Sequence, residues 1–427
     1  MKRSIKTLLA AALCGLSLVS SGMAADKDNW AQWGGPNRDH KSPATGLKQS
    51  WPDGGPKVVW TFKEAGFGFS SPAVVDGKLY TLGMQDGKNY AIALDSKTGK
   101  ELWRQVTGDE VKDDAYAHGW GGGPRSTPTV VGNRVIVLDD GGNLLSLAAA
   151  TGKVEWKRNL LNDFGGTMPK WGYSESPLVD GDRVIVCPGG KEYLVGLNIT
   201  SGEKIFGSTD YEEGAHYVSV IKHTVEGVPM YITANSKGVV AFSATDGKVL
   251  WKADGSGNNT ATIPTPIVTG NLVYHTSNYN TGSILVKLSK EGSGIKAEKL
   301  YFSNDMQNHH GGVVLVDDHI FGVKKGAGFL CQNLKDGKMV WNQRLGDDGS
   351  ASVAFADGRI YVYGDTSGKC FLVEPSTSAW KTVGELSLPE QTKLPRKQGK
   401  IWAHPVIAEG KLFLRDHDLL YAFDIAE

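Results

Sequence analysis

The most regular feature of the chain is a short hydrophobic run, a two-residue polar turn and a second hydrophobic run, which recur eight times. Copies such as AVVDGKLYTL and TVVGNRVIVL place Asp-Gly or Gly-Asn between β-branched and aromatic residues. Turns of this kind need positive φ and connect the two strands of a β-hairpin. The turns recur about every 48 residues, a period typical of repeat architectures. They centre on Gly77, Gly132, Gly181, Gly227, Gly270, Asp318, Gly358 and Gly410.

A second motif follows most of the hairpins and predicts two further strands. It reads ALDSKTGKELW at 93–103 and FSATDGKVLW at 242–251, which is a strand, a Gly-Lys turn and a strand with an aromatic residue. Four strands in each unit of roughly 40–50 residues are typical of a propeller blade. Because the aromatic residue recurs once per unit, it predicts packing between neighbouring blades. These residues are Trp103, Trp156, Phe206, Trp251 and Trp341.

The two ends of the repeat array predict how the ring closes. The eighth hairpin, at 406–415, is followed by a single strand, LLYAFDI, so the last blade lacks its fourth strand. A separate Trp-containing strand lies at 57–62. We expect that strand to complete blade 8 and to pair both open edges. The predicted fold class is therefore all-β, an eight-bladed propeller of four-stranded antiparallel blades over residues 57–427.

The first residues indicate export from a bacterial cytoplasm. Residues 1–6 are basic, 8–19 are apolar, and Gly22-Met23-Ala24 supplies small residues where a signal peptidase cuts. The apolar stretch is shorter than the roughly 20 residues that span a bilayer, and no other stretch of the chain could span one. The sequence therefore predicts a signal peptide over 1–24 and a periplasmic or secreted mature protein.

The segment between this leader and the repeats has its own composition. Residues 25–56 are rich in Gly, Pro, Asp and Asn and contain Trp30 and Trp33. We interpret the segment as an ordered extension that lies across one propeller face, with both indoles docked on it.

The charge balance excludes one large class of partner. Lys and Arg together number 46, and Asp and Glu together also number 46, so the formal net charge is zero. A nucleic-acid binder needs a basic face, and we expect none here.

Three cysteines follow the signal peptide, an odd number in an oxidising compartment. The simplest interpretation is that Cys187, Cys331 and Cys370 are small buried residues in strands. A Cys331–Cys370 disulfide is the alternative, because both residues lie in corresponding parts of consecutive repeats.

The ALDSKTGKELW type of blade ending resembles the repeat of the pyrroloquinoline-quinone (PQQ) propeller family. Quinoprotein alcohol dehydrogenases carry this repeat, and so do outer membrane assembly factors of the BamB type. The resemblance covers about residues 57–425, and the earlier WAQWGGPNRD resembles the lead of secreted BamB-like propellers. Because one fold hosts many functions, the resemblance implies the propeller and leaves its function open.

Aromatic and polar residues gather just before the first strand of each blade, where a propeller meets its ligands at the channel mouth. Five of the ten histidines lie there. Aromatic faces with a few convergent polar groups are typical of a small-molecule pocket, although the same side chains could simply fill the channel. The candidates are His118, Trp120, Arg125, Trp171, Tyr173, Glu175, His216, Tyr217, His309, His310, Trp402 and His404.

The sequence supports two functions of different classes. The one that we favour is an exported BamB-like platform that binds a small molecule or an envelope protein at this mouth. The alternative is a PQQ-dependent oxidoreductase acting on alcohols or sugars. PQQ is a planar tricarboxylate, so it would need a stacking ring, cationic partners, a Ca²⁺ held by oxygen ligands and a base. The candidates for these roles, in that order, are Trp120, Trp171 or Trp402; Arg125, Lys324 or Arg415; Glu175 with Asn278; and Asp305 or Asp347. The chain lacks the adjacent Cys pair of those enzymes and any haem-attachment motif, which favours the platform.

The histidines do not have the spacing of a metal site. His309 and His310 are adjacent, and neighbouring residues of a regular strand point to opposite faces. We therefore expect at most one of the two to face the channel, and we predict no metal site.

Overall fold

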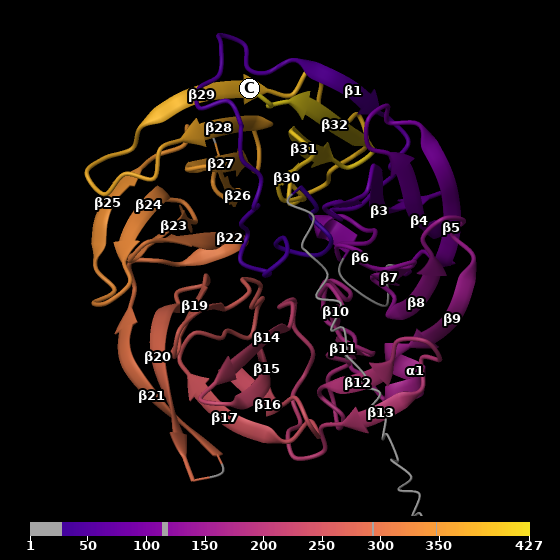
Figure 1. Ribbon diagram of the computed structural model, residues 1–427, viewed down its shortest axis with the longest axis vertical. Coiled ribbons are helices and arrows are strands. Elements are labelled where there is room, and N and C mark those ends of the chain that lie inside the picture. The colour runs from indigo at the N-terminus through magenta and orange to yellow at the C-terminus, as the bar shows by residue number, and fades with distance from the viewer. Residues whose placement is uncertain (1–27, 113–117, 293, 347) are drawn as a thin grey trace, which may run out of the picture.

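The chain folds into a ring of eight β-sheets (Figure 1). The computed structural model describes residues 28–112, 118–292, 294–346 and 348–427. Each sheet has four antiparallel strands, with its first strand toward the centre and its last at the outer rim. The prediction of an all-β, eight-bladed propeller is confirmed.

The first four blades follow one another in sequence. Their strands are β2 (Ala73–Val75), β3 (Lys78–Gln85), β4 (Lys88–Asp95) and β5 (Glu101–Asp109) in blade 1; β6 (Thr129–Val131), β7 (Arg134–Leu138), β8 (Asn143–Ala148) and β9 (Val154–Asn159) in blade 2; β10 (Leu178–Asp180), β11 (Arg183–Val186), β12 (Val195–Asn198) and β13 (Lys204–Gly207) in blade 3; and β14 (Ile221–Val225), β15 (Val228–Ala234), β16 (Gly238–Ser243) and β17 (Val249–Asp254) in blade 4.

The remaining blades continue the same order until the last. Their strands are β18 (Ile267–Thr269), β19 (Leu272–Ser277), β20 (Gly282–Glu291) and β21 (Gly294–Ser303) in blade 5; β22 (Asn308–Val316), β23 (His319–Lys324), β24 (Gly328–Asn333) and β25 (Met339–Gln343) in blade 6; β26 (Ala351–Ala356), β27 (Arg359–Gly364), β28 (Lys369–Val373) and β29 (Thr382–Ser387) in blade 7; and β30 (Val406–Ala408), β31 (Lys411–Asp416), β32 (Leu419–Asp424) and β1 (Val58–Phe62) in blade 8.

Blade 8 joins the two ends of the ring. Strand β1 pairs antiparallel with β32, in a register that places Val58 opposite Phe423 and Phe62 opposite Leu420. The N-terminal strand therefore supplies the outer strand of the last blade, and the predicted closure is confirmed.

In five of the blades, the aromatic residue of the outer strand explains the glycine in the turn of the next blade. A Cβ on Gly152 would lie 2.6 Å from the indole of Trp103, and Gly152 has φ +72°. The Nε1 of Trp103 also donates to the carbonyl of Ala149 in that turn. The same close approach of an aromatic ring to a turn glycine joins Trp60 to Gly99, Trp156 to Gly202, Phe206 to Gly247 and Tyr301 to Gly337. The predicted role of these aromatic residues in packing between blades is confirmed.

Two further aromatic residues pack against the next blade without this contact to a glycine. Trp341 donates from Nε1 to the carbonyl of Ser376 in the irregular turn of blade 7. Trp251 packs in a hydrophobic cluster that blade 4 shares with Val273 and Ile284 of blade 5.

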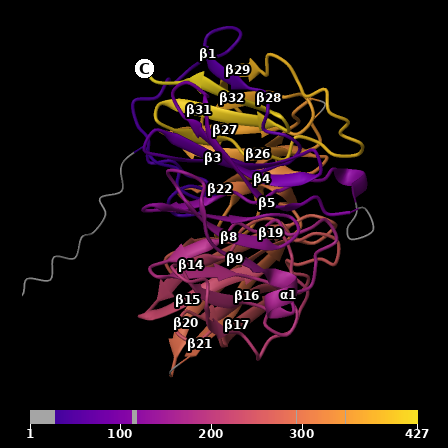
Figure 2. The ribbon, with the colours of Figure 1, turned by 90° about the vertical axis from the view of Figure 1, so that its right-hand side faces the viewer.

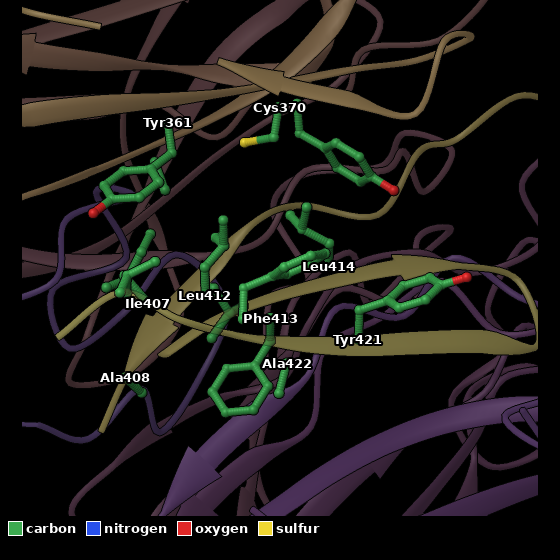
Figure 3. Close-up of a cluster of buried hydrophobic side chains, with 14 of the residues drawn as sticks. Tyr361, Cys370, Ile407, Ala408, Leu412, Phe413, Leu414, Tyr421 and Ala422 are labelled. Atoms are coloured by element: carbon green, nitrogen blue, oxygen red, sulfur yellow. The ribbon is translucent and has the colours of Figure 1, made fainter. Parts of the chain in front are cut away.

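The hydrophobic core lies between neighbouring blades rather than at one centre. Figure 3 shows such a cluster, in which Tyr361 and Cys370 of blade 7 face Leu412 and Leu414 of blade 8. The described cysteines, Cys187, Cys331 and Cys370, are all buried and free, so the alternative of a Cys331–Cys370 disulfide is wrong.

Residues 28–56 precede β1 and lie across one face of the ring, toward its centre in Figure 1 and along one side of it in Figure 2. Trp30 exchanges two backbone hydrogen bonds with Val74 of β2. The backbone N–H of Ser42 donates to the carbonyl of Phe355 in β26, and Leu47 forms an antiparallel β-bridge with Ala426 after β32. The segment is thus attached to blades 1, 7 and 8.

Helices are few in the described part of the chain. They are the 3₁₀ helix η1 (His118–Trp120) and the five-residue helix α1 (Leu160–Phe164). Neither has the length and hydrophobicity needed to cross a membrane. The predicted signal peptide, residues 1–24, lies outside the described residues.

Candidate functional site

A cavity of about 380 Å³ lies at one end of the central channel. A volume of this size is within the range of small-ligand sites. Eight of the twelve predicted residues line it: Trp120, Arg125, Trp171, Tyr217, His309, His310, Trp402 and His404. The remaining lining residues are Trp33, Phe69, Lys170, Ser174, Ser219, Thr260, Ala261, Ile263, Tyr279 and Lys325.

The propeller topology explains why residues from so many blades meet here. Most of the lining residues lie in the segments that lead into the first strands, such as 69 before β2, 120–125 before β6 and 402–404 before β30. Because these innermost strands all run in the same direction relative to the channel, their entry segments gather at one end.

Tyr279 and Lys325 reach the cavity from a different kind of position. They lie in the turns between the second and third strands of blades 5 and 6. In an antiparallel blade this turn lies at the same end as the entry to the first strand. Neither residue was among the predicted candidates, although the hairpin pattern was enough to place their turns on this side.

The N-terminal segment contributes the inner end of the cavity. The Nε1 of Trp33 donates to Oγ1 of Thr265 at 2.9 Å. The ring of Trp33 lies edge-on to His404, with the ring centres 4.5 Å apart. His40 stacks on His404, at 5.3 Å and an interplanar angle of 17°, and also lies edge-on to Trp33, with the ring centres 5.2 Å apart. The sequence predicted a docked Trp33 but did not place it in the site.

Arg38 fixes this segment to blade 3. Its Nη2 donates to the carbonyl of Ser176 at 2.6 Å, and its Nη1 donates to the carbonyl of Pro177 at 3.2 Å and to Gln32 at 2.9 Å. Only 3% of Arg38 is exposed, and this burial lowers its pKa to about 9. The guanidinium thus supplies the hydrogen-bond donors for two carbonyls that directly precede β10, the inner strand of blade 3.

His309 and His310 both face the cavity, contrary to the expectation for adjacent residues of a strand. The register of β22 against β23 shifts between Asn308 and Val313, and Gly312 has φ +70°. A bulge of this kind breaks the alternation of side chains. The two rings therefore lie edge to face, with their Nδ1 atoms 3.3 Å apart.

Three of the predicted residues have their side chains away from the cavity. Tyr173 is buried against blade 3 and donates from its hydroxyl to Pro188 at 2.8 Å. Glu175 is also buried and accepts the backbone N–H of Cys187. Nδ1 of His216 accepts the backbone N–H of Thr262 at 3.3 Å. These side chains satisfy backbone groups, which the spacing along the sequence could not reveal.

His118 is the last of the twelve. Its backbone begins η1, and its side chain lies outside what the structure describes. The neighbouring Trp120 is 42% exposed and forms part of the rim.

The histidines of the cavity are neutral at physiological pH. Burial, with a smaller effect of nearby Lys325 and Lys400, lowers the pKa of His310 to about 3. Burial also holds the pKa values of His309 and His404 well below the usual value for histidine. Each ring therefore offers one N–H donor and one acceptor nitrogen rather than a charge.

The positive charge of the cavity comes from three side chains, each of which lies over an aromatic ring. These pairs are Arg125 over Phe69 at 5.3 Å, Lys170 over Trp171 at 5.0 Å and Lys325 over Tyr279 at 5.5 Å. Such stacking orients the cation, and Arg125 also donates to the carbonyls of Gly121 and Gly123. No Asp or Glu is among the described residues that line the cavity.

These residues do not fit the calcium–PQQ arrangement that the family resemblance implies. The cations would suit the carboxylates of PQQ, but Ca²⁺ needs several oxygen ligands. Glu175 points elsewhere, and the described residues include no group of three or more His, Cys, Asp or Glu placed to hold a metal ion. We therefore assign no redox step to this site.

The family model described as outer membrane protein assembly factor BamB matches residues 87–343. The chain belongs to the BamB family. BamB of Shewanella oneidensis is 23% identical over 97% of this chain and 97% of its own length.

Solved structures show how widely the BamB fold is shared. BamB from Moraxella catarrhalis has a TM-score of 0.58 at 15% identity, covering 87% of this chain and all of the other. Quinohemoprotein alcohol dehydrogenase from Comamonas testosteroni reaches 0.66 at 14% identity, covering 94% of this chain and 81% of the other. At these identities the likeness concerns the fold alone.

Proposed function

We propose that this protein is an exported, periplasmic member of the BamB family that serves as an interaction platform in the assembly of outer membrane proteins. The observation that carries the proposal is the relationship to BamB of Shewanella oneidensis, which extends over 97% of both chains. The predicted signal peptide supplies the route to the envelope.

The cavity gives this platform a defined binding site. Trp120, Trp171 and Trp402 provide flat apolar surfaces, and Arg125 provides a charge at the rim. Sites with this composition bind a small molecule or an inserted side chain. We assign the platform's ligand recognition to this end of the channel.

Complementation tests the proposal. The full chain is expressed in Shewanella oneidensis that lacks its own BamB, and folded outer membrane barrels are quantified by their heat-modifiable migration on gels. We expect the barrels to return toward the wild-type amount. A variant lacking residues 1–24 is the matched control and should not restore them. A chain that reaches the periplasm and leaves the barrels depleted contradicts the proposal.

Titration with PQQ tests the alternative function. Purified protein is mixed with PQQ and Ca²⁺, followed by an alcohol and an artificial electron acceptor. We expect no dye reduction, because no Asp or Glu that could bind calcium or act as the base is among the described residues that line the cavity. Turnover that depends on both PQQ and the alcohol would establish the oxidoreductase instead.

A further inference from the structure

Residues 30–42, which we call the plug, lie toward the centre of the ring (Figure 1). Strands β2, β6 and β26 are the innermost strands of blades 1, 2 and 7, and the backbone of the plug is hydrogen-bonded to all three. Between these attachments, Trp33 lies under the cavity as its floor. The backbone bonds join Trp30 to Val74 of β2, Ala31 to Val130 of β6, and His40 and Ser42 to Phe355 of β26.

The tip of the plug has a strained backbone. Arg38 and His40 have φ of +58° and +62°, a left-handed conformation that costs roughly 1 kcal/mol or more for a residue with a Cβ. Gly34 and Gly35 also have positive φ, and the backbone N–H of His40 donates to the carbonyl of Gly34 at 2.8 Å. The surrounding walls hold the tip in this conformation, so the strain is relieved if the tip leaves the channel.

His40 brings the plug against two histidines of the channel wall. Its ring stacks on that of His404, and His310 lies edge-on to His404 with the ring centres 6.3 Å apart. Strand β22 closes on the other nitrogen, because a Cβ on Gly312 would lie 2.7 Å from Nε2 of His40. Three imidazoles from the plug, β22 and the entry to blade 8 are thus packed together.

The charges that act on these rings are all positive. Burial disfavours a proton on each ring, and Arg38 adds to this effect on His40. His404 is affected in the same sense by His40 and by His310. Like charges at such distances repel strongly in a buried site. The cations that act on His310 are Lys325 and Lys400.

The acids near the plug have other partners. Asp39 accepts the backbone N–H of Lys41 at 3.2 Å, and Asp365 is paired with Lys400 at 3.7 Å. Glu175 acts on Arg38 rather than on the histidines. In the part of the chain that the structure describes, no carboxylate stabilises a positive charge on His40.

The contact between the plug and the wall is polar and incompletely paired. Nε2 of His40, Nδ1 of His404 and Nε2 of His310 lack a hydrogen-bond partner among the described residues, as does Nε of Arg38. Native proteins rarely leave buried polar atoms unpaired. These groups gain hydrogen bonds to water when the tip leaves the channel, which favours the released state.

We propose that the plug is an acid-operated gate: at low pH, positive charge on His40, His404 and His310 expels residues 30–42 from the channel while the eight blades stay folded. Release removes Trp33 from the floor of the cavity, so acidification changes the binding site at the mouth. The inference goes beyond the proposed function, which does not require the plug to move.

The plug can leave without opening the ring, because separate contacts hold the chain after it. Leu47 forms a β-bridge with Ala426, and the ring of Trp51 lies 5.8 Å from that of Tyr361 in blade 7. Strand β1 follows these contacts and keeps its full pairing with β32. Local opening of a segment without global unfolding is common in proteins.

Hydrogen–deuterium exchange of the purified full chain at pH 7 and pH 4.5 tests the inference, with rates corrected for the intrinsic effect of pH. The plugged state lowers the pKa of His40 from 6.5 to about 4. The released state therefore binds more protons below pH 6.5, and its population rises as the pH falls. We expect exchange in residues 30–42 to accelerate at least about fiftyfold at pH 4.5, the effect of His40 alone. Blade strands such as β15 should keep their protection.

His40→Phe keeps a ring on His404 but cannot take a proton. Its acceleration should be at least about tenfold smaller than that of wild type. His319→Phe is the matched control and should behave as wild type, since His319 begins β23 outside the stacked rings. If His40→Phe does not fold, His404→Phe makes the same comparison from the wall.

Three results would overturn the inference. One is loss of protection in the plug and the blades together at pH 4.5, which indicates global unfolding. Another is equal acceleration in His40→Phe and wild type. The third is protection that fails to return when the pH is restored to 7, since a gate must close again.

Discussion

Trp33 donates a hydrogen bond to Thr265, although 232 residues separate them along the chain. The bond ties the N-terminal segment to the entry of blade 5 and closes the inner end of the cavity. Residues before the first blade are therefore part of the site, and a fragment that starts at β1 would lack its floor.

Trp33→Phe removes this hydrogen bond and keeps an aromatic ring in place. We expect a loss of about 1 kcal/mol in the free energy of unfolding, the usual value for one buried hydrogen bond. Urea titrations of Trp33→Phe, Thr265→Val and the double variant measure the coupling. Additive effects of the two substitutions would show that the bond contributes nothing.

Gly99 and Gly77 form a natural pair for testing the contact that closes the ring. Their φ angles are +72° and +76°, but a Cβ on Gly99 would lie 2.7 Å from the indole of Trp60, whereas a Cβ on Gly77 would meet nothing within 4 Å. Both Ala variants carry the same backbone strain, about 1 kcal/mol. We expect Gly99→Ala to lose a further 1–3 kcal/mol from overpacking, roughly the cost of such clashes in cores. Thermal unfolding checks this, and similar melting temperatures for the two variants would refute it.

Glu175 gives the stability of the protein a pH dependence of defined sign. Burial raises its pKa from 4.5 to about 8 in the folded state, so the folded state binds one more proton than the unfolded state between these values. Its contribution is therefore present below pH 4.5 and is lost as the pH rises to about 8. Glu175→Gln removes this loss. The free energy of unfolding of the variant, relative to that of wild type, should therefore increase by roughly 1.4 kcal/mol per pH unit as the pH rises over this window. Urea titrations at pH 5.5 and 7.5 measure the change, and a constant difference would contradict the assignment.

The buried histidines act in the opposite direction. Burial lowers the pKa of His40 to about 4 and that of His310 to about 3, from 6.5. The unfolded state thus binds more protons below pH 6.5, and stability is lost as the pH falls from there toward these values. Each such histidine adds up to about 1.4 kcal/mol per pH unit to the slope of the free energy of unfolding against pH. We expect the slope between pH 6.5 and 4.5 to be reduced in His310→Gln, as measured by urea midpoints. An unchanged slope would show that His310 does not titrate in this way.

The sequence alone determined the architecture, because its strongest signals are local. Hairpin turns such as that at Gly77 depend on backbone conformations that a few residues select. The recurring glycine and aromatic residue, such as Gly152 and Trp103, reveal blade packing because each blade repeats the same contact with its neighbour. Even the closure by β1 followed from one missing strand in the last repeat.

The tertiary structure alone decided which side chains meet in the cavity. Tyr173 and Glu175 lie in the same entry segment as Trp171, yet they turn away to satisfy backbone groups of blade 3. His309 and His310 face the same way because of a bulge that depends on the pairing of β22 with β23. Trp33 reaches the site only because its segment crosses the ring. Side-chain direction at such positions depends on long-range contacts, and a local pattern does not contain them.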